Sequence, residues 1–341
     1  MKTVLRLAVL ALAGAAALAL AGNALATQKL SVRQTATSLT IKVSQAGPSP
    51  GPADPQPAKI QIYVPTGYTI NASQTPGTKI GTTTGTVFAS DQNIPLPLSG
   101  DVVVVPPTTN APGCDPVPHL AVWNLALSVA GQTINLPVHV DQTAGPETAL
   151  GTYKLVVCLA PSDVPQGTPG RSPFGALLLD ATLTVENVFT VPTGQSIWKT
   201  ITTPYAARTG VPNVAGTVET RSFVGAGAVT VASRVTNKAR RIVRMTGRVS
   251  QSGSAVAGAQ VTILVNGKAR FRARTNAGGN YSLTLKKTGK RATTSFQARV
   301  TVAERDITSV GCATPSLPRV ACVSATSSPF TAVSRKIQIR I

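Results

Sequence analysis

Apolar and polar residues alternate along most of the chain with the period of two that β-strands show. The alternation is clearest over residues 39–43, 60–64, 123–129, 153–159 and 183–191. Stretches rich in Pro and Gly separate these segments, which is typical of antiparallel strands with one face in water. No segment after residue 26 shows the period of an amphipathic helix. We therefore expect an all-β protein.

The first predicted domain spans residues 27–215. One of its segments, Val102 to Val105, is a continuous apolar run, which predicts a strand buried on both faces. Two loops rich in Pro and Gly, residues 47–57 and 161–173, are expected to join strands. The region is long enough to bury one substantial β core.

The second predicted domain spans residues 222–341, with alternating segments at 243–249, 281–285 and 296–302. The dipeptide Asn266-Gly267 lies between two further strand-like segments. It is the strongest short signal for a β-hairpin, because both residues tolerate positive φ. Several short strands at this spacing predict a β-sandwich.

Three segments of the second domain resemble a known family. Thr246-Gly-Arg-Val249, Val256-Ala-Gly-Ala-Gln-Val261 and Thr275-Asn-Ala-Gly-Gly-Asn-Tyr-Ser282 are similar to the pattern of carboxypeptidase-regulatory-like and related bacterial Ig-like domains. The resemblance covers about residues 222–310. It implies an Ig-like or prealbumin-like β-sandwich used as an accessory, adhesion or spacer module, and it implies no activity.

Residues 1–26 have the pattern of a secretory signal peptide. Lys2 and Arg6 precede an apolar run from Leu7 to Ala21, and Ala24-Leu25-Ala26 is the small-x-small exit that signal peptidase requires. A transmembrane anchor is the alternative, but the run is too short and a polar, turn-rich sequence follows it. We therefore expect a secreted, extracellular protein with no membrane span, either soluble or held at the cell envelope by contacts.

The four cysteines, Cys114, Cys158, Cys312 and Cys322, all follow the signal segment. An even number in an exported chain indicates disulfides, and four cysteines allow three connectivities. Pairing Cys114 with Cys158 and Cys312 with Cys322 is the simplest, because each bridge then stays inside one predicted domain. No pair has the C-x-x-C spacing of zinc or redox sites, which favours a structural role.

Positive charge is concentrated in the last third of the chain. Residues 221–341 contain 21 Lys and Arg against Glu304 and Asp306, a net charge of +19, whereas residues 27–220 have a net charge of −1. Alternation predicts that six arginines point outward from their strands: Arg244, Arg248, Arg270, Arg272, Arg274 and Arg299. If these strands are neighbours in one sheet, the six guanidinium groups share one surface.

Such a surface suits the phosphate and carboxylate oxygens of anionic cell-wall polymers, acidic polysaccharides or lipid head groups. The alternative is that these arginines are solvated charges that prevent edge-to-edge aggregation. Nucleic acid is not expected as a partner. Aromatic residues are sparse in this domain, and Phe271 and Phe296 are expected in its core, which leaves little for base stacking.

The first domain contains the two histidines of the chain, His119 and His139. His139 and Asp141 are two residues apart on a predicted strand and share one face, and the loop that carries Asp115 and His119 is long enough to reach them. Two imidazoles and a carboxylate can bind zinc, but this spacing matches no zinc motif, and a His-x-Asp pair on the surface is the alternative.

The sequence thus predicts an exported, non-enzymatic binding, adhesion or structural protein with two β-sandwich-like domains and no cofactor. Its basic domain is expected to contact anionic polymers of the envelope. One alternative is a secreted hydrolase with a site around His119 and His139, although no G-x-S-x-G elbow or paired carboxylates are present. Another is a spacer with no specific ligand. The oligomeric state and the ligand of the first domain stay open.

Overall fold

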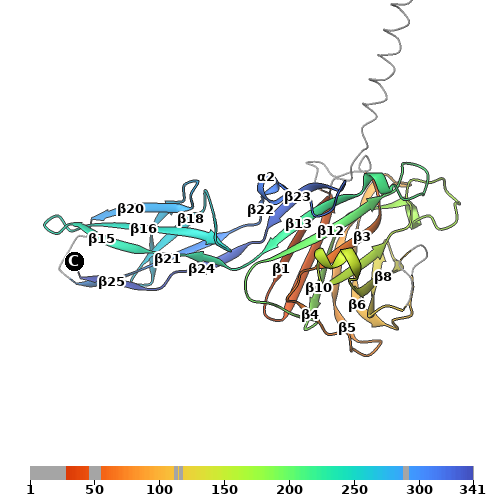
Figure 1. The fold of residues 1–341 in the computed structure, drawn as a ribbon, viewed down its shortest axis with the longest axis horizontal. Helices are drawn as coiled ribbons and strands as arrows, with labels where there is room; N and C mark the ends of the chain where they lie inside the picture. The colour runs from red at the N-terminus through yellow and green to blue at the C-terminus, as the bar shows by residue number, and fades with distance from the viewer. Residues whose placement is uncertain (1–27, 46–54, 111–113, 115–117, 287–291, 341) are drawn as a thin grey trace, which may run out of the picture.

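The structure of the protein is a computed structural model that describes residues 28–45, 55–110, 114, 118–286 and 292–340. The predicted signal peptide, residues 1–26, lies outside this range, as does most of the predicted loop 47–57. The described chain is all-β and forms two lobes that lie end to end (Figure 1). Its short helices are α2 (Thr308–Gly311) and the 3-10 helices η1 (Gly145–Ala149), η2 (Pro173–Gly175) and η3 (Val214–Gly216). Across the described segments, no helix has the length and apolar composition needed to cross a membrane.

The first lobe is one 13-stranded sheet, which we call the large sheet. Its strands, in spatial order, are β1 (Gln28–Gln34), β2 (Ser38–Gln45), β10 (Ala176–Glu186), β5 (Lys79–Ala89), β6 (Ile94–Val105), β7 (Ala121–Val129), β8 (Gln132–Gln142), β9 (Tyr153–Cys158), β3 (Pro57–Val64), β12 (Ser196–Pro204), β13 (Val218–Val224), β23 (Ala321–Ser327) and β22 (Arg305–Asp306). Two further strands, β4 (Thr69–Ile70) and β11 (Phe189–Thr190), pair with each other. Neighbouring strands of the large sheet are antiparallel, except that β13 and β23 are parallel.

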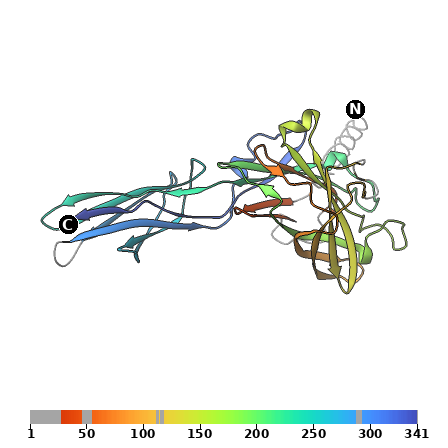
Figure 2. The same cartoon turned by 90° about the horizontal axis from the view of Figure 1, so that it is seen from below.

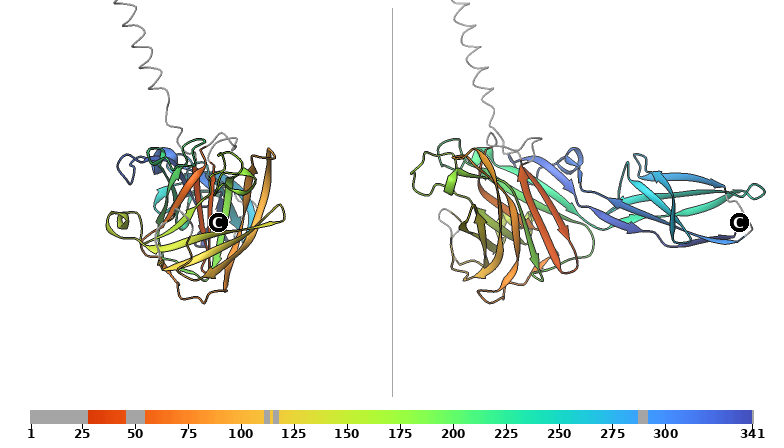
Figure 3. Two further views of the ribbon diagram at one scale, coloured as in Figure 1. Left: turned by 90° about the vertical axis from the view of Figure 1, so that its right-hand side faces the viewer. Right: turned by 180° about the vertical axis from the view of Figure 1, so that it is seen from behind.

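The large sheet curves until its first strand packs against its last strands (Figure 3, left). Hydroxyl groups connect β1 to β13 and β23: Val32 N donates to Ser222 Oγ at 2.9 Å, Ser324 Oγ to Gln28 O at 2.8 Å, and Thr326 Oγ1 to Leu30 O at 2.7 Å. The concave face encloses an apolar core that includes the fully buried Trp123 and Trp198.

The second lobe, which we call the distal sandwich, has two facing sheets and a core of its own. One sheet contains β14 (Gly227–Val229), β15 (Ala232–Asn237), β16 (Ile242–Gln251), β17 (Ser254–Ala255) and β20 (Asn280–Lys286). The other contains β18 (Gln260–Val265), β19 (Lys268–Arg274), β21 (Thr293–Val302), β24 (Phe330–Val333) and β25 (Ile337–Arg340). The predicted hairpin is confirmed: Asn266 and Gly267 turn between β18 and β19 with φ of 49° and 80°.

Three of the predicted strands differ from the structure. Phe271 of β19, which was expected in the core, is 41% exposed, because β19 is exposed along most of its length. The segment 183–191 is divided between β10 and β11, because Asn187 adopts a φ of 55°, which ends the extended backbone. The run from Val102 to Val105 is not buried on both faces. Val102 and Val104 are buried while Val103 and Val105 are partly exposed, so this end of β6 has one covered face.

The chain crosses between the lobes three times. It leaves the large sheet after β13, returns from β21 to β22, and leaves again between β23 and β24 (Figure 2). The predicted division into residues 27–215 and 222–341 therefore needs correction, because β22, α2 and β23 lie in the second range but belong to the first lobe. The prediction assumed that a domain is one continuous segment of the chain. The pairing of β23 with β13, in contrast, joins residues that are far apart in the sequence.

The side chain of Gln251, at the end of β16, forms hydrogen bonds with residues in each of the three segments that cross between the lobes. Its amide nitrogen donates to Gly225 O at 3.3 Å and Ser328 O at 2.9 Å. Its amide oxygen accepts from Arg305 Nη2 at 2.7 Å and Ser327 Oγ at 2.6 Å. The residue is 4% exposed, and burial lowers the pKa of Arg305 below its ordinary value. A buried polar side chain therefore fixes the junction between the lobes.

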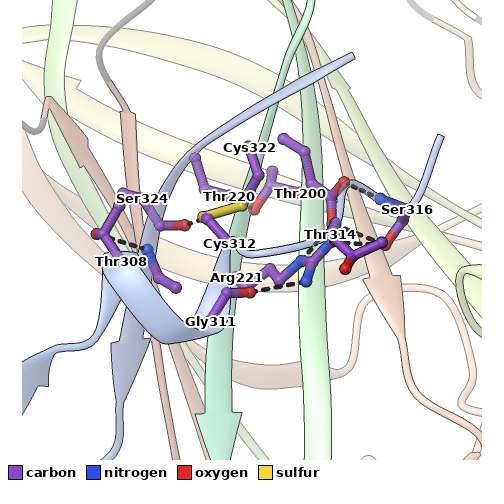
Figure 4. The surroundings of a disulfide bond; sticks show 12 residues. Thr200, Thr220, Arg221, Thr308, Gly311, Cys312, Thr314, Ser316, Cys322 and Ser324 are labelled. Atoms are coloured by element: carbon purple, nitrogen blue, oxygen red, sulfur yellow. Dashed lines mark hydrogen bonds and ion pairs between the residues drawn. A yellow bond between two sulfur atoms is a disulfide. The ribbon is translucent and has the colours of Figure 1, made fainter. Parts of the chain in front are cut away.

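A buried ion pair and a disulfide fix the excursion between β22 and β23 (Figure 4). Arg221 Nε donates to the fully buried Glu219 at 2.6 Å, and its other nitrogens donate to Gly311 O at 2.7 Å and Thr314 O at 2.6 Å. The predicted pairings Cys312–Cys322 and Cys114–Cys158 are both confirmed. The first holds α2 against β23, and the second holds the loop before β7 at the end of β9.

Replacing Gln251 by Ala should lower the free energy of unfolding by about 1–3 kcal/mol, because several buried groups lose their hydrogen-bond partner. Urea unfolding measures the change. The matched control is Gln260→Ala on β18, where the side chain is exposed and the expected change is within about 0.5 kcal/mol. Equal effects of the two substitutions would contradict the role of Gln251 at the junction.

Replacing Arg221 by Met should cost about 3–5 kcal/mol, since it leaves the carboxylate of Glu219 buried without its partner. Amide hydrogen exchange over residues 311–320 should accelerate at the same time. Arg319→Met is the control, because Arg319 lies in the same segment and is exposed. Unchanged exchange in the Arg221 variant would show that the disulfide alone holds the segment.

Candidate functional site

The net positive charge of the chain after residue 26 comes entirely from the segments that form the distal sandwich. Residues 225–302 and 328–341 contain 18 Lys and Arg and no Asp or Glu. Residues 27–224 and 303–327, which include the large sheet, contain 12 basic and 12 acidic residues. The asymmetry of charge is therefore larger between the lobes than between the predicted domains. One lobe has equal numbers of basic and acidic residues, and the other has no acidic side chain to offset its positive charge.

All six predicted arginines are exposed, but they do not share one surface. Arg244 and Arg248 lie on β16 in one sheet of the distal sandwich. The other four lie on the opposite sheet, Arg270, Arg272 and Arg274 on β19 and Arg299 on β21. The expectation of a single face with six guanidinium groups is wrong, because alternation predicts which side of a strand faces outward but not which sheet contains it.

On the sheet with β19, the arginines form a compact group. Arg272 and Arg299 are both register partners of Thr262 on the central β18, so the three residues form one row across three strands. Adjacent strands are about 4.8 Å apart, which puts the two arginines about 10 Å apart at their backbones. Arg274 lies two residues further along β19, and its Nε donates to Gly258 O at 3.1 Å.

On the sheet with β16, Arg244 lies directly opposite Arg234 of β15. Its Nε donates to Ser282 Oγ on β20 at 3.1 Å, which holds the guanidinium over the sheet. Sequence reasoning missed Arg234. The alternation of exposed and partly buried residues along β15 would have placed it outward in the same way as Arg244.

A third basic group lies at the end of the distal sandwich that is remote from the large sheet (Figure 1, left). The β15–β16 turn carries Lys238 and Arg240, both exposed. Strand register brings three more basic residues to this end: Lys268 begins β19 opposite Val265, Lys286 is opposite Ile242, and Arg340 is opposite Thr293. Both faces and the end of the lobe are therefore positively charged.

The structure brings His119, His139 and Asp141 together, but not at the surface. The two imidazole rings stack with centroids 4.2 Å apart and an angle of 8° between their planes, and His119 Nδ1 lies 2.9 Å from Asp141 Oδ1. His119 is 6% and His139 0% exposed. The alternative of a surface His-x-Asp pair is therefore wrong, since the loop before β7 covers this end of β7 and β8; His119 N donates to Pro107 O.

This arrangement does not suit zinc. Nitrogen lone pairs lie in the planes of their rings, so two nearly parallel rings do not direct them to one point about 2.0–2.1 Å from each. In the described part of the chain, no group of three His, Cys, Asp or Glu could hold a metal ion. Asp115, the other acid considered, lies outside the described residues.

A comparison with protein-family models and with curated proteins found no match for this chain. The resemblance of residues 222–310 to Ig-like modules therefore stays a prediction. The two facing sheets of the distal sandwich agree with a sandwich architecture in general terms.

Replacing Asp141 by Ala should destabilise the protein by about 1–3 kcal/mol, because buried His119 loses its partner. Asp101→Ala is the control, since Asp101 pairs with Lys79 at an exposed position where such pairs contribute about 0–1 kcal/mol. Urea unfolding measures both variants, and added Zn²⁺ should leave the unfolding midpoint of the unmodified protein unchanged. A rise of that midpoint with Zn²⁺ would contradict the structural role of the histidine pair.

Proposed function

We propose that the protein is a secreted, non-enzymatic binding protein of the cell envelope, whose distal sandwich contacts anionic polymers. The observation that carries the proposal is the complete absence of acidic side chains from a lobe with 18 basic ones, beside a lobe with balanced charge. An uncompensated field of this kind attracts polyanions at long range. Secretion is supported by the signal-peptide pattern of residues 1–26 and by two disulfides, which are typical of oxidising compartments.

The distribution of arginines favours a long, flexible ligand. Basic groups lie on both sheets and at the end of the distal sandwich, so a compact ligand contacts only one of them at a time. A polymer chain with repeated phosphate or carboxylate groups follows the lobe from one face to another. The planar fork of arginine binds such groups in pairs of hydrogen bonds, which favours teichoic-type polymers and acidic polysaccharides as the ligand class.

The enzymatic alternative has less support. The two histidines on which it depends are buried, and His119 is engaged with Asp141. Their packing accounts for both residues without a substrate. The spacer alternative differs from our proposal in one measurable property, since a spacer has no affinity for polyanions.

The secreted chain should bind a polyphosphate or teichoic-type polymer with an affinity that falls about tenfold or more between about 50 and about 200 mM salt. Polymer binding at several salt concentrations, measured by titration calorimetry, tests this expectation. Affinity that does not depend on salt would rule out the electrostatic proposal, and absence of binding at low salt would favour the spacer.

Charge-neutral and charge-retaining variants identify the surface that binds. Arg270, Arg272 and Arg274 changed together to Gln should weaken binding on the order of tenfold, because three neighbouring exposed charges are lost. The matched control changes the same three residues to Lys, which keeps the charge and should retain most of the affinity. The corresponding Gln variants of Arg234, Arg244 and Arg248 test the opposite sheet. If neither Gln set differs from the unmodified protein, these two faces are not the binding surface.

A further inference from the structure

The large sheet contains an apolar cleft that has no part in polymer binding. The cleft has a volume of about 540 Å³ and lies among the ends of β7, β8 and β10 and the loop that follows β9. Its apolar wall includes Leu98, Leu127, Ile134, Leu136 and Leu178. Small-molecule sites have volumes of about 300–1,000 Å³ and mostly apolar walls, so the cleft has the size and lining of a ligand site.

A smaller cavity in the interior of the curved sheet shares wall residues with the cleft. It has a volume of about 70 Å³ and lies among the core residues, and five leucines line both spaces: Leu98, Leu127, Leu136, Leu159 and Leu178. The walls of the inner cavity are aliphatic apart from Thr83. Leucine side chains therefore form the boundary of both the outer and the inner space.

The lining excludes several classes of ligand. No charged side chain lines either space among the described residues, so nothing there offsets the charge of a buried ion. The one aromatic ring is Tyr205, whose hydroxyl already donates to Leu159 O at 2.6 Å. Without further rings for stacking, the walls suit an aliphatic chain better than a planar aromatic compound.

Two buried hydroxyl groups indicate where polar atoms of a ligand would lie. Ser172 is among the residues that line the cleft and Thr83 among those that line the inner cavity, and the hydroxyl of neither has a hydrogen-bond partner among the described residues. Both side chains are more than nine-tenths buried. A buried hydroxyl without a partner is costly, and a ligand with an ester, hydroxyl or un-ionised carboxyl oxygen beside Ser172 would satisfy it.

The walls of the cleft are held in place. Arg171 donates two hydrogen bonds to Asp91, at 2.9 and 2.6 Å, and its guanidinium holds the pKa of that carboxyl below its ordinary value. Gln56 donates to Ala160 O and accepts from Ser162 N, both at 2.6 Å, which fixes the loop after β9. The Cys114–Cys158 disulfide lies beside this loop. The site is therefore formed before any ligand enters.

From these observations we infer that the cleft of the large sheet binds one aliphatic acyl chain, with the chain along the leucine-lined wall of the cleft and its polar end beside Ser172. A free fatty acid and a single-chain phospholipid share this chemistry. The inference does not depend on polymer binding by the distal sandwich, because none of the arginines discussed above lines the cleft.

A fluorescent fatty acid, cis-parinaric acid, tests the inference on the secreted chain with its disulfides intact. We expect a saturable rise in fluorescence at one equivalent per chain, and competition by palmitate. Competition by lysophosphatidylcholine identifies a phospholipid as the source of the chain, whereas competition by palmitate alone identifies a free fatty acid. No saturable rise would overturn the inference, and so would stronger competition by aminoanthracene than by palmitate.

Ala176→Phe adds a bulky ring to the wall of the cleft and should reduce the affinity for parinaric acid by about tenfold or more. Ala228→Phe, at an exposed position on β14, is the matched control and should bind as the unmodified protein does. Thermal unfolding shows that each variant is folded, and Ile134→Asn provides a second change in the cleft wall that adds no bulk. Unchanged binding in both folded cleft variants would overturn the inference.

The Gln variants of the arginines should bind parinaric acid normally, so failure of one proposal is distinguishable from failure of the other.

Discussion

The parallel pairing of β13 with β23 is the contact on which the rest of the architecture depends. Parallel neighbours cannot be joined by a tight turn, so the chain between them must form a long connection. In this protein that connection contains most of the distal sandwich. The chain therefore crosses the junction three times, and a single buried amide, that of Gln251, contacts residues of every crossing. Two lobes joined in this way have less freedom than two domains on one linker.

The path of the chain between the lobes also explains why acidic residues are absent from the distal sandwich. Glu304 follows the return crossing and lies against β1, where it accepts a hydrogen bond from Ser31 and pairs with Lys29. Asp306 accepts hydrogen bonds from the backbone N and the hydroxyl of Thr308, the first residue of α2, and these bonds lower the pKa of its carboxyl. The two acidic residues of the last third of the sequence thus form their contacts within the first lobe. The distal sandwich is left without any, and its positive potential acts on solvent from all sides.

The large sheet contains apolar space that its side chains do not fill. A curved sheet of this size encloses more volume than its aliphatic side chains fill near the ends of β7 and β8, and the hydroxyl of Ser172, which lines this space, has no hydrogen-bond partner in the described part of the chain. The surrounding loops are nevertheless fixed by an ion pair, a buried glutamine and a disulfide. Well-ordered walls around unfilled apolar space are typical of binding proteins rather than of loosely packed ones. We infer that the two lobes have separate ligands, an aliphatic chain in one and a polyanion on the other.

Sequence by itself determined the features that depend on neighbours along the chain. Alternation predicted most of the strands, Asn266-Gly267 predicted its hairpin, pairing within predicted domains favoured the disulfides that the structure contains, and counting charges located the basic third. Tertiary structure alone decided that β23 belongs to the large sheet, that the six arginines are divided between two sheets, that His119 and His139 stack in the interior, and that leucines from four strands line one cleft. The physical reason is the same in each case. The period of two predicts which side of a strand is apolar, but the order of strands in a sheet is set by contacts between residues far apart in the sequence, which no local pattern contains.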